Sequence, residues 1–192
     1  MPAAVLAGGA SRRMGRPKAA LPYGAGTLLE FQTGRLAGLF PEVFAVVKQP
    51  PDFPLGPARL LCDGASGHAA IFGLLRALEE VEDRVFVMAV DLPALSLDVI
   101  RAIAGRGAET AAPALVPRAA GVLQPLAAVW RREIVPLARE RIARGSLSLQ
   151  GLAEEAGAEV MPEVVWRESD PSGNAFLNMN TLEEYAAMRE RG

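Results

Sequence analysis

The sequence is short of residue types on which several common mechanisms depend. Cys62 is the only cysteine and His68 the only histidine among 192 residues. An internal disulfide and a cysteine-rich metal site are therefore excluded, and no Ser/His/Asp or Cys/His catalytic set is available. We give His68 no role beyond that of a polar cap or a surface residue. Any chemistry must rest on other groups.

Long apolar runs are also lacking. No run reaches the roughly 20 residues of a membrane-spanning helix, and the N-terminus does not have the charged and apolar segments of a signal peptide. Lys and Arg (20) nearly balance Asp and Glu (22), which gives a formal net charge of −2 and no general attraction to nucleic acid or membrane. We expect a cytoplasmic protein whose partners are small anions.

The pattern of the chain predicts one α/β domain over residues 1–192, because the chain is long enough for one full core and 51% of it is hydrophobic. Strands alternate with helices, which favours a mostly parallel sheet covered on both faces. A hairpin-like excursion is expected around residues 118–121. The expected strands are 3–6, 42–47, 60–62, 84–90, 114–117, 122–130 and 159–166; the expected helices are 28–40, 68–81, 96–105, 131–144, 147–156 and one after Thr181. Capping boxes are expected at Thr27/Glu30 and Thr181/Glu184.

The first eighteen residues hold the most distinctive pattern. The apolar run 3–6 predicts a buried strand, and Gly8-Gly9 after it leaves backbone N–H groups open to an anion or a base edge. Four cations follow, as a bound triphosphate would need: Arg12, Arg13, Arg16 and Lys18. The spacing does not match a P-loop, because Gly15 is followed by arginine and proline and not by lysine and a hydroxyl residue. It does not match a dinucleotide fingerprint either, because the proline argues against a helix directly after the glycines. The alternative is a glycine turn before a solvated basic loop.

Arginine supplies nearly all the positive charge of the chain, since Lys18 and Lys48 are the only lysines. A lysine kept against that bias suggests a compact point charge on a phosphate, so Lys18 is a candidate phosphate ligand. The residues alone give Lys48 no role.

Two aspartates follow predicted strands. Asp91 ends the most apolar strand and precedes Leu92-Pro93, so it is a candidate ligand of Mg²⁺, which prefers one or two carboxylates together with phosphate oxygens. Asp63 is a candidate contact to a ribose hydroxyl or a base donor. The alternatives are a helix cap for Asp91 and an Asp-Gly turn for Asp63. Parallel strands would bring Gly8, Asp63 and Asp91 to one edge of the sheet.

Leu6-Ala7-Gly8-Gly9, followed by Arg13-Met14-Gly15-x-x-Lys18, resembles the N-terminal signature of the nucleotidyltransferase superfamily. Within it the chain is most similar to the molybdenum cofactor guanylyltransferases (MobA family). Gln124-Pro125-Leu126 is similar to the family's acceptor-side segment, and residues 176–181 resemble its C-terminal Asn-x-Asn-Thr motif. The resemblance implies a Rossmann-like three-layer αβα nucleotidyltransferase fold, with 1–107 as the nucleotide-binding part and 108–192 as the acceptor-binding part.

The resemblance also implies an activity, namely transfer of GMP from MgGTP to the terminal phosphate of molybdopterin carrying molybdenum, with release of pyrophosphate. It implies nucleotide contacts by Leu6, Ala7, Gly8, Gly9, Arg13, Lys18, Asp63 and Asp91. Arg13, Lys18 and Asp91 would be catalytic, Asp91 would bind Mg²⁺, and Gln124, Asn178 and Asn180, with Arg118 nearby, would border the acceptor.

An ionised acceptor phosphate needs no general base, which agrees with the missing histidine sets. Four alternatives remain open: a cytidylyltransferase on the same acceptor, a transferase for another phosphorylated small molecule, a silent carrier module that hands the cofactor to a partner enzyme, and an α/β scaffold with no nucleotide. Transient contacts with cofactor-biosynthesis or acceptor enzymes are a further expectation.

Overall fold

The computed structural model describes residues 1–9, 17–65, 67–179 and 184, and its centre is a twisted sheet of eight strands. The strand order is β10-β7-β9-β6-β1-β4-β5, and β8 pairs with β7. A separate small sheet pairs β2 (Pro22–Tyr23) with β3 (Gly26–Thr27). The strands of the main sheet are β1 (Ala3–Leu6), β4 (Val43–Val47), β5 (Arg59–Cys62), β6 (Arg84–Ala89), β7 (Ala114–Ala119), β8 (Val122–Leu123), β9 (Ala127–Arg131) and β10 (Glu159–Met161).

The half of the sheet built by the first part of the chain is parallel, as predicted. β1 lies between β4 and β6 and is parallel to both, and β5 continues the parallel order beyond β4. β9 interrupts this order because it lies between β6 and β7 and is antiparallel to both. The predicted hairpin is confirmed as β7 and β8, and β10 joins β7 in parallel.

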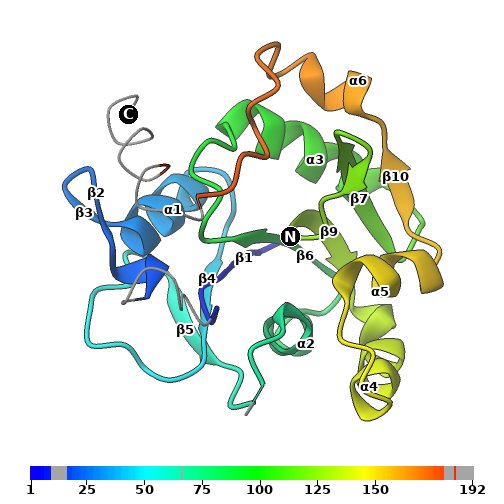
Figure 1. Ribbon diagram of the computed structural model, residues 1–192, viewed down its shortest axis with the longest axis horizontal. Helices are drawn as coiled ribbons and strands as arrows, with labels where there is room; N and C mark the ends of the chain where they lie inside the picture. The colour runs from blue at the N-terminus through cyan, green and yellow to red at the C-terminus, as the bar shows by residue number, and fades with distance from the viewer. Residues whose placement is uncertain (10–16, 66, 180–183, 185–192) are drawn as a thin grey trace.

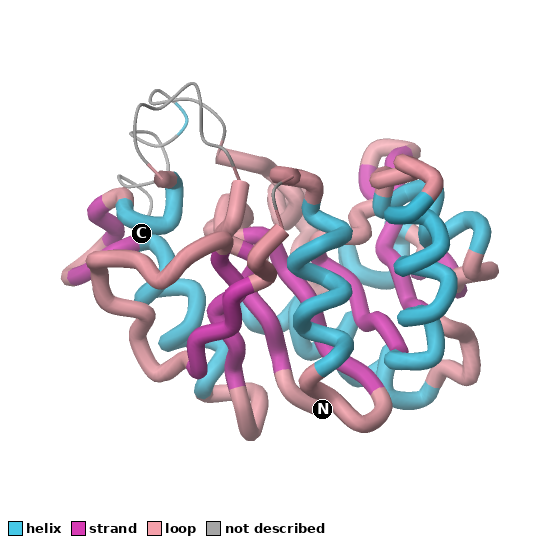
Figure 2. Tube along the Cα trace, turned by 90° about the horizontal axis from the view of Figure 1, so that it is seen from below, coloured by secondary structure: helices cyan, strands magenta, loops and turns pink. Residues whose placement is uncertain are grey.

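Helices cover both faces of the sheet, so the fold has three layers (Figures 1 and 2). Figure 1 shows α1, α3 and α6 along one face and α2, α4 and α5 along the other. The alternation of β1 explains this, because Ala3 and Val5 belong to one core cluster while Ala4 and Leu6 belong to the other. The helices are α1 (Leu28–Ala37), α2 (Ala70–Glu79), α3 (Leu97–Glu109), α4 (Val135–Ala143), α5 (Leu149–Glu155) and α6 (Glu163–Arg167).

Local capping sets where several helices begin. The capping box of Thr27 and Glu30 is present in full, with each side chain bonded to the backbone N–H of the other residue. Ser96 caps α3, because its hydroxyl accepts the N–H of Val99. The predicted box at Thr181 lies outside the described residues. No helix among the described residues has both the length and the apolar character needed to cross a membrane.

Three predicted elements need correction. The strand expected over 159–166 ends at Met161, because Pro162 has no N–H for a ladder and instead precedes α6. The run 122–130 is split by a turn at 124–126, where the N–H of Ala127 bonds to the carbonyl of Gln124. The helix expected from Arg131 begins only at Val135, after a 3-10 turn over Arg132–Ile134, with Pro136 in its first turn.

Candidate functional site

The four parallel strands β6, β1, β4 and β5 end at one edge of the sheet, and the residues that follow them form the site. Backbone hydrogen bonds extend the ladder just beyond the strands: the N–H of Ala7 donates to Val46, that of Asp63 to Val47 and that of Val90 to Leu6. Consequently Gly8, Lys48, Asp63 and Asp91 all emerge at this edge. The predicted common edge of Gly8, Asp63 and Asp91 is therefore present.

Asp91 and Lys18 meet at one end of this edge. Nζ of Lys18 lies 2.7 Å from Oδ2 of Asp91, and their side chains are 15% and 22% exposed. Lys18 begins a 3-10 turn over Lys18–Ala20, directly after the basic segment. A carboxylate and an ammonium that are both partly open to solvent suit a ligand that carries phosphate and a cation.

The backbone around Asp91 is held by side chains of α1 and by the C-terminal segment. Gln32 Nε2 donates to the carbonyl of Val90 at 3.0 Å, and the N–H of Met179 donates to the carbonyl of Asp91 at 3.0 Å. The guanidinium of Arg35 donates to the carbonyls of the following loop, at Leu92, Pro93 and Leu95. Burial lowers the pKa of Arg35 to about 10, partly offset by Tyr23, and the group stays charged at neutral pH.

Asp63 and Lys48 form a second pair at the other end of the edge. Lys48 Nζ lies 2.9 Å from Asp63 Oδ1, and the Asp63 side chain is only 4% exposed. The same oxygen accepts the N–H of Ala65 at 3.1 Å. The ammonium lies 5.1 Å from the centre of the Phe72 ring, and the lysine stem packs beside Gly8, where a Cβ would lie 3.4 Å from Lys48 Cγ.

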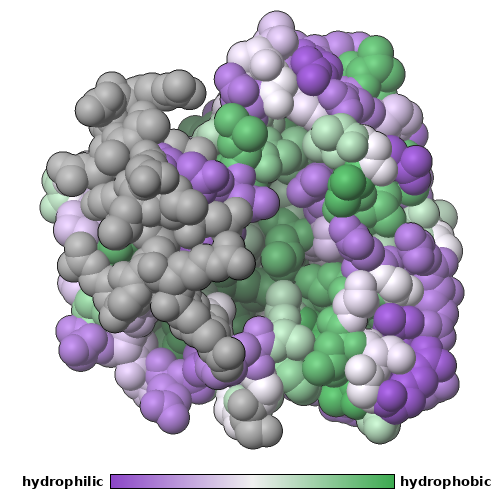
Figure 3. All heavy atoms as spheres, in the orientation of Figure 1, coloured by the Kyte–Doolittle hydropathy of each residue, from purple (hydrophilic) through white to green (hydrophobic). Residues whose placement is uncertain are grey.

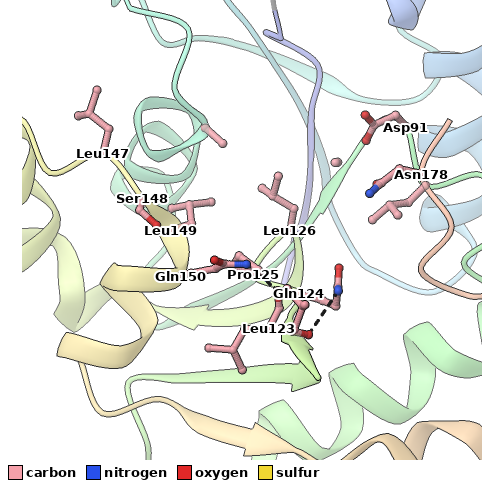
Figure 4. Close-up of a pocket in the computed structure, with 14 residues that line it drawn as sticks. Asp91, Leu123, Gln124, Pro125, Leu126, Leu147, Ser148, Leu149, Gln150 and Asn178 are labelled. Carbon is pink, nitrogen blue, oxygen red and sulfur yellow. Dashed lines mark hydrogen bonds between the residues drawn. The ribbon is translucent and has the colours of Figure 1, made fainter. Parts of the chain in front are cut away.

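A cavity of about 520 Å³ opens next to Asp91. In Figure 4, Asp91 and Asn178 lie at one side of it, Leu147–Gln150 lie at the opposite side, and Gln124–Leu126 lie between them. Figure 3 shows a hollow with hydrophobic residues in this face of the molecule. The lining residues are Ala70, Ala89, Asp91, Leu92, Val122, Leu123, Gln124, Pro125, Leu126, Leu147, Ser148, Leu149, Gln150 and Asn178. Asp91 is the only charged side chain among these described residues.

The predicted site residues fall into three groups. Leu6, Ala7, Gly8, Gly9, Asp63 and Asp91 lie in or just after the strands that end at this edge, Lys18 reaches Asp91 there from a 3-10 turn, and Gln124 and Asn178 line the cavity. Arg13 and Asn180 lie outside the described residues. Arg118 is exposed and does not line the cavity; its carbonyl instead accepts the indole N–H of Trp166.

Sequence reasoning left the role of Lys48 open, and it did not find Ser148 and Gln150 on the far wall of the cavity. The scarcity of lysine was a signal for Lys48. No local signal marks Ser148 and Gln150, which read only as the start of a helix.

The residues at the edge fit a divalent cation at Asp91 better than at Asp63. Asp91 is the more exposed carboxylate, and among the described residues its hydrogen bond from Lys18 goes to one oxygen, Oδ2. Asp63 is nearly enclosed and Oδ1 already accepts two donors. No group of three or more His, Cys, Asp or Glu side chains in the described part of the chain could hold a metal, but Mg²⁺ on a phosphate needs only one or two carboxylates.

Comparison with known proteins gives one consistent answer. Residues 3–159 match a family described as the MobA-like NTP transferase domain. The chain is 29% identical to the molybdenum cofactor guanylyltransferase of Syntrophotalea carbinolica, over 99% of this chain and 91% of that protein. It is 35% identical to a probable molybdenum cofactor guanylyltransferase of Mycobacterium avium, over 83% of this chain and 84% of that one.

A solved structure has the same architecture. The molybdopterin-guanine dinucleotide biosynthesis protein A of Archaeoglobus fulgidus superposes with a TM-score of 0.85, at 22% identity, over 100% of this chain and 98% of that one. At this identity the likeness concerns the fold, and it confirms the predicted Rossmann-like arrangement.

Proposed function

Because the chain belongs to the MobA-like NTP transferase family and is a nucleotidyltransferase, we propose that it transfers GMP from MgGTP to the terminal phosphate of molybdopterin. The observation that carries this proposal is that Asp91 belongs both to the edge of the sheet and to the cavity beside it. Its carboxylate pairs with Lys18 at the edge of the sheet and also lines the adjacent cavity. A nucleotide at the edge and an acceptor in the cavity would therefore meet at Asp91.

The nucleotide side of the site uses the first part of the chain, residues 1–107. The backbone of Leu6, Ala7, Gly8 and Gly9 would contact guanine and ribose, and Asp63 would contact the nucleotide further along the edge. Lys18 and Arg13 would bind the phosphates, because ammonium and guanidinium groups are donors only and match phosphate oxygens. Asp91 would hold Mg²⁺, which when bound neutralises charge on the phosphates.

The acceptor side uses the second part, residues 108–192, and its lining suits an uncharged ring system. Leu123, Leu126 and Leu149 supply apolar surface, while the amides of Gln124, Gln150 and Asn178 supply donors and acceptors. A pterin has this combination of flat faces and a polar edge. With its ring in the cavity, the phosphate of the acceptor would point toward Asp91 and Lys18.

The chain's own residues would act by alignment and by charge. An oxygen of the acceptor phosphate forms a new bond to the α-phosphorus of GTP, the bond from that phosphorus to the bridging oxygen breaks, and pyrophosphate leaves with the electron pair. The acceptor oxygen is already largely ionised near neutral pH, so no general base is needed. Lys18 and Arg13 offset the charge that grows on the leaving group.

The test is a turnover assay with Mg²⁺ and molybdopterin, comparing GTP, CTP, ATP and UTP in wild type and in Asp91→Asn. We expect the guanine dinucleotide and pyrophosphate from GTP alone, and a loss of rate on the order of 10²-fold or more in the variant. Product from CTP alone would identify a cytidylyltransferase. Nucleotide binding without pyrophosphate would identify a carrier module, and no binding at all would leave only a scaffold. Handover to an acceptor enzyme stays a prediction.

A further inference from the structure

The hydrogen-bond ladder between β1 and β6 stops halfway through its last step. Leu6 lies opposite Ala89, and the N–H of Val90 still donates to the carbonyl of Leu6 at 3.1 Å. In a continuing parallel ladder the carbonyl of Val90 would next accept the N–H of Gly8, two residues beyond Leu6. That bond is missing, because the Gly8 N–H donates to no carbonyl among the described residues.

A side chain of α1 takes the place of the missing donor. Gln32 is fully buried in the second turn of this helix, and its Nε2 donates to the carbonyl of Val90 at 3.0 Å. Its Oε1 is also buried and accepts from none of the described residues. A buried amide with an unpaired oxygen costs stability that an apolar side chain of the same length would avoid. The bond to Val90 is therefore the physical reason for an amide at this position.

This bond turns the chain out of the sheet just before Asp91. Because α1 covers one face of the sheet, a carbonyl that bonds to Gln32 is directed away from β1 and toward that face. Residues 90 and 91 accordingly form a turn and do not continue the strand. The place where β6 ends is thus fixed by a side chain 58 residues away in the sequence.

The same helix also supports the partner of Asp91. The N–H of Leu28, the first residue of α1, donates to the carbonyl of Leu21, and the N–H of Leu21 donates to the carbonyl of Lys18. α1 therefore holds the turn that carries Lys18 at its N-terminus and the residue before Asp91 one turn further along. This common support fixes the ammonium and the carboxylate relative to each other, at the 2.7 Å between Nζ and Oδ2.

We propose that Gln32 is a positioning residue for nucleotidyl transfer: its amide replaces the Gly8 N–H at the Val90 carbonyl, which sets Asp91 beside Lys18 and leaves the Gly8 N–H open to the nucleotide. The inference rests on the proposed function, because it takes Asp91 as the Mg²⁺ ligand. It assigns a role in the reaction to a residue that contacts neither substrate.

The first test is amide hydrogen exchange followed by NMR, which needs no substrate. In wild type we expect the protection of the Gly8 amide to be about 10-fold or more below that of Ala7, because the Ala7 N–H donates to Val46. Gln32→Met keeps the length of the side chain and removes the donor. The Val90 carbonyl then takes the next donor of the ladder, so protection of Gly8 should rise by roughly fivefold or more.

The second test is turnover with GTP, Mg²⁺ and molybdopterin. In Gln32→Met we expect kcat to fall by about 10- to 100-fold, because the carboxylate is misplaced. The Mg²⁺ concentration for half-maximal rate and the dissociation constant of MgGTP should each rise by about fivefold. Thr33→Val is the matched control: Thr33 is the next residue of α1, is equally buried, and donates to the carbonyls of Leu29 and Leu55, away from the site. It should lower stability and leave all three values unchanged.

Several results would overturn the inference. Protection of Gly8 equal to that of Ala7 in wild type would show that the ladder does not end at Val90, and this result does not depend on how a variant folds. A wild-type kcat and Mg²⁺ requirement in Gln32→Met, or the same losses in Thr33→Val, would reduce Gln32 to a part of the core. Absence of GMP transfer by wild type, with Gly8 unprotected, would overturn the proposed function and the role of Gln32 in it, but not the end of the ladder.

Discussion

In the proposed function the ion pair between Lys18 and Asp91 opens when the nucleotide binds, and this makes a specific prediction for Asp91→Asn. Nζ of Lys18 lies 2.7 Å from Oδ2 of Asp91. In the proposed complex the ammonium contacts a phosphate and the carboxylate binds Mg²⁺. Without the metal, Asp91 therefore opposes the triphosphate twice, because it occupies Lys18 and repels negative charge.

The size of this effect follows from the geometry of the pair. Coulomb's law gives about 6 kcal/mol for charges 2.7 Å apart at an effective dielectric constant of about 20. Both side chains are partly open to solvent, so desolvation and screening offset most of that value, and a net contribution of about 1 kcal/mol is reasonable. This corresponds to roughly fivefold in a dissociation constant.

We therefore expect Asp91→Asn to bind metal-free GTP about fivefold more tightly than wild type, although it transfers GMP on the order of 10²-fold more slowly. Isothermal titration calorimetry with EDTA and then with Mg²⁺ measures the affinity for GTP without and with the metal, and the variant should gain little affinity from the metal. Asp98→Asn is a matched control, because Asp98 is an exposed aspartate of α3, with its side chain 70% exposed. Weaker metal-free binding by Asp91→Asn would refute the reasoning.

Three further changes test how the fold supports the site. Arg35→Met removes the guanidinium that donates to the carbonyls of Leu92, Pro93 and Leu95; chemical denaturation should show a loss of about 2–4 kcal/mol, and kcat should fall more than affinity for GTP changes. Gly107→Ala would place a methyl group against Val129 where α3 packs on β9, which should cost about 1–3 kcal/mol of unfolding free energy with unchanged GTP affinity. Hydrogen bonds from Thr110 and Arg106 hold the pKa of Glu159 below its usual range; this carboxylate stabilises the fold above its unfolded pKa and less as pH falls through the folded value. The difference in stability between wild type and Glu159→Gln should therefore be present at pH 7 and shrink below about pH 4.

The parallel half of the fold could be predicted because its signals are local. Residues 85–89 form a continuous apolar run within β6, and Thr27 with Glu30 caps α1 through side chains only three residues apart. The order of strands past β6 could not be predicted in this way. β9 lies antiparallel between β6 and β7, and its own sequence does not indicate which strands it pairs with.

The cavity was hard to predict because it, too, depends on contacts between distant parts of the chain. Its walls come from segments far apart in the chain, at Asp91, Gln124, Gln150 and Asn178. Gln124 and Asn178 were found through resemblance to a family and not through their chemistry. Gln150 belongs to the first turn of α5, where an amide is an ordinary surface residue, and only the packing of α5 beside the turn at 124–126 brings it to the cavity.

The two lysines show how much composition alone can contribute to locating a site. Composition marks Lys18 and Lys48 as exceptions in a chain with 20 basic residues, but only the register of β4 against β5, which pairs Val47 with Cys62, sets Lys48 beside Asp63. Each lysine then contacts one of the two aspartates at the edge. A residue type that is rare in the whole chain and gathered at one edge therefore indicates where a compact charge is required.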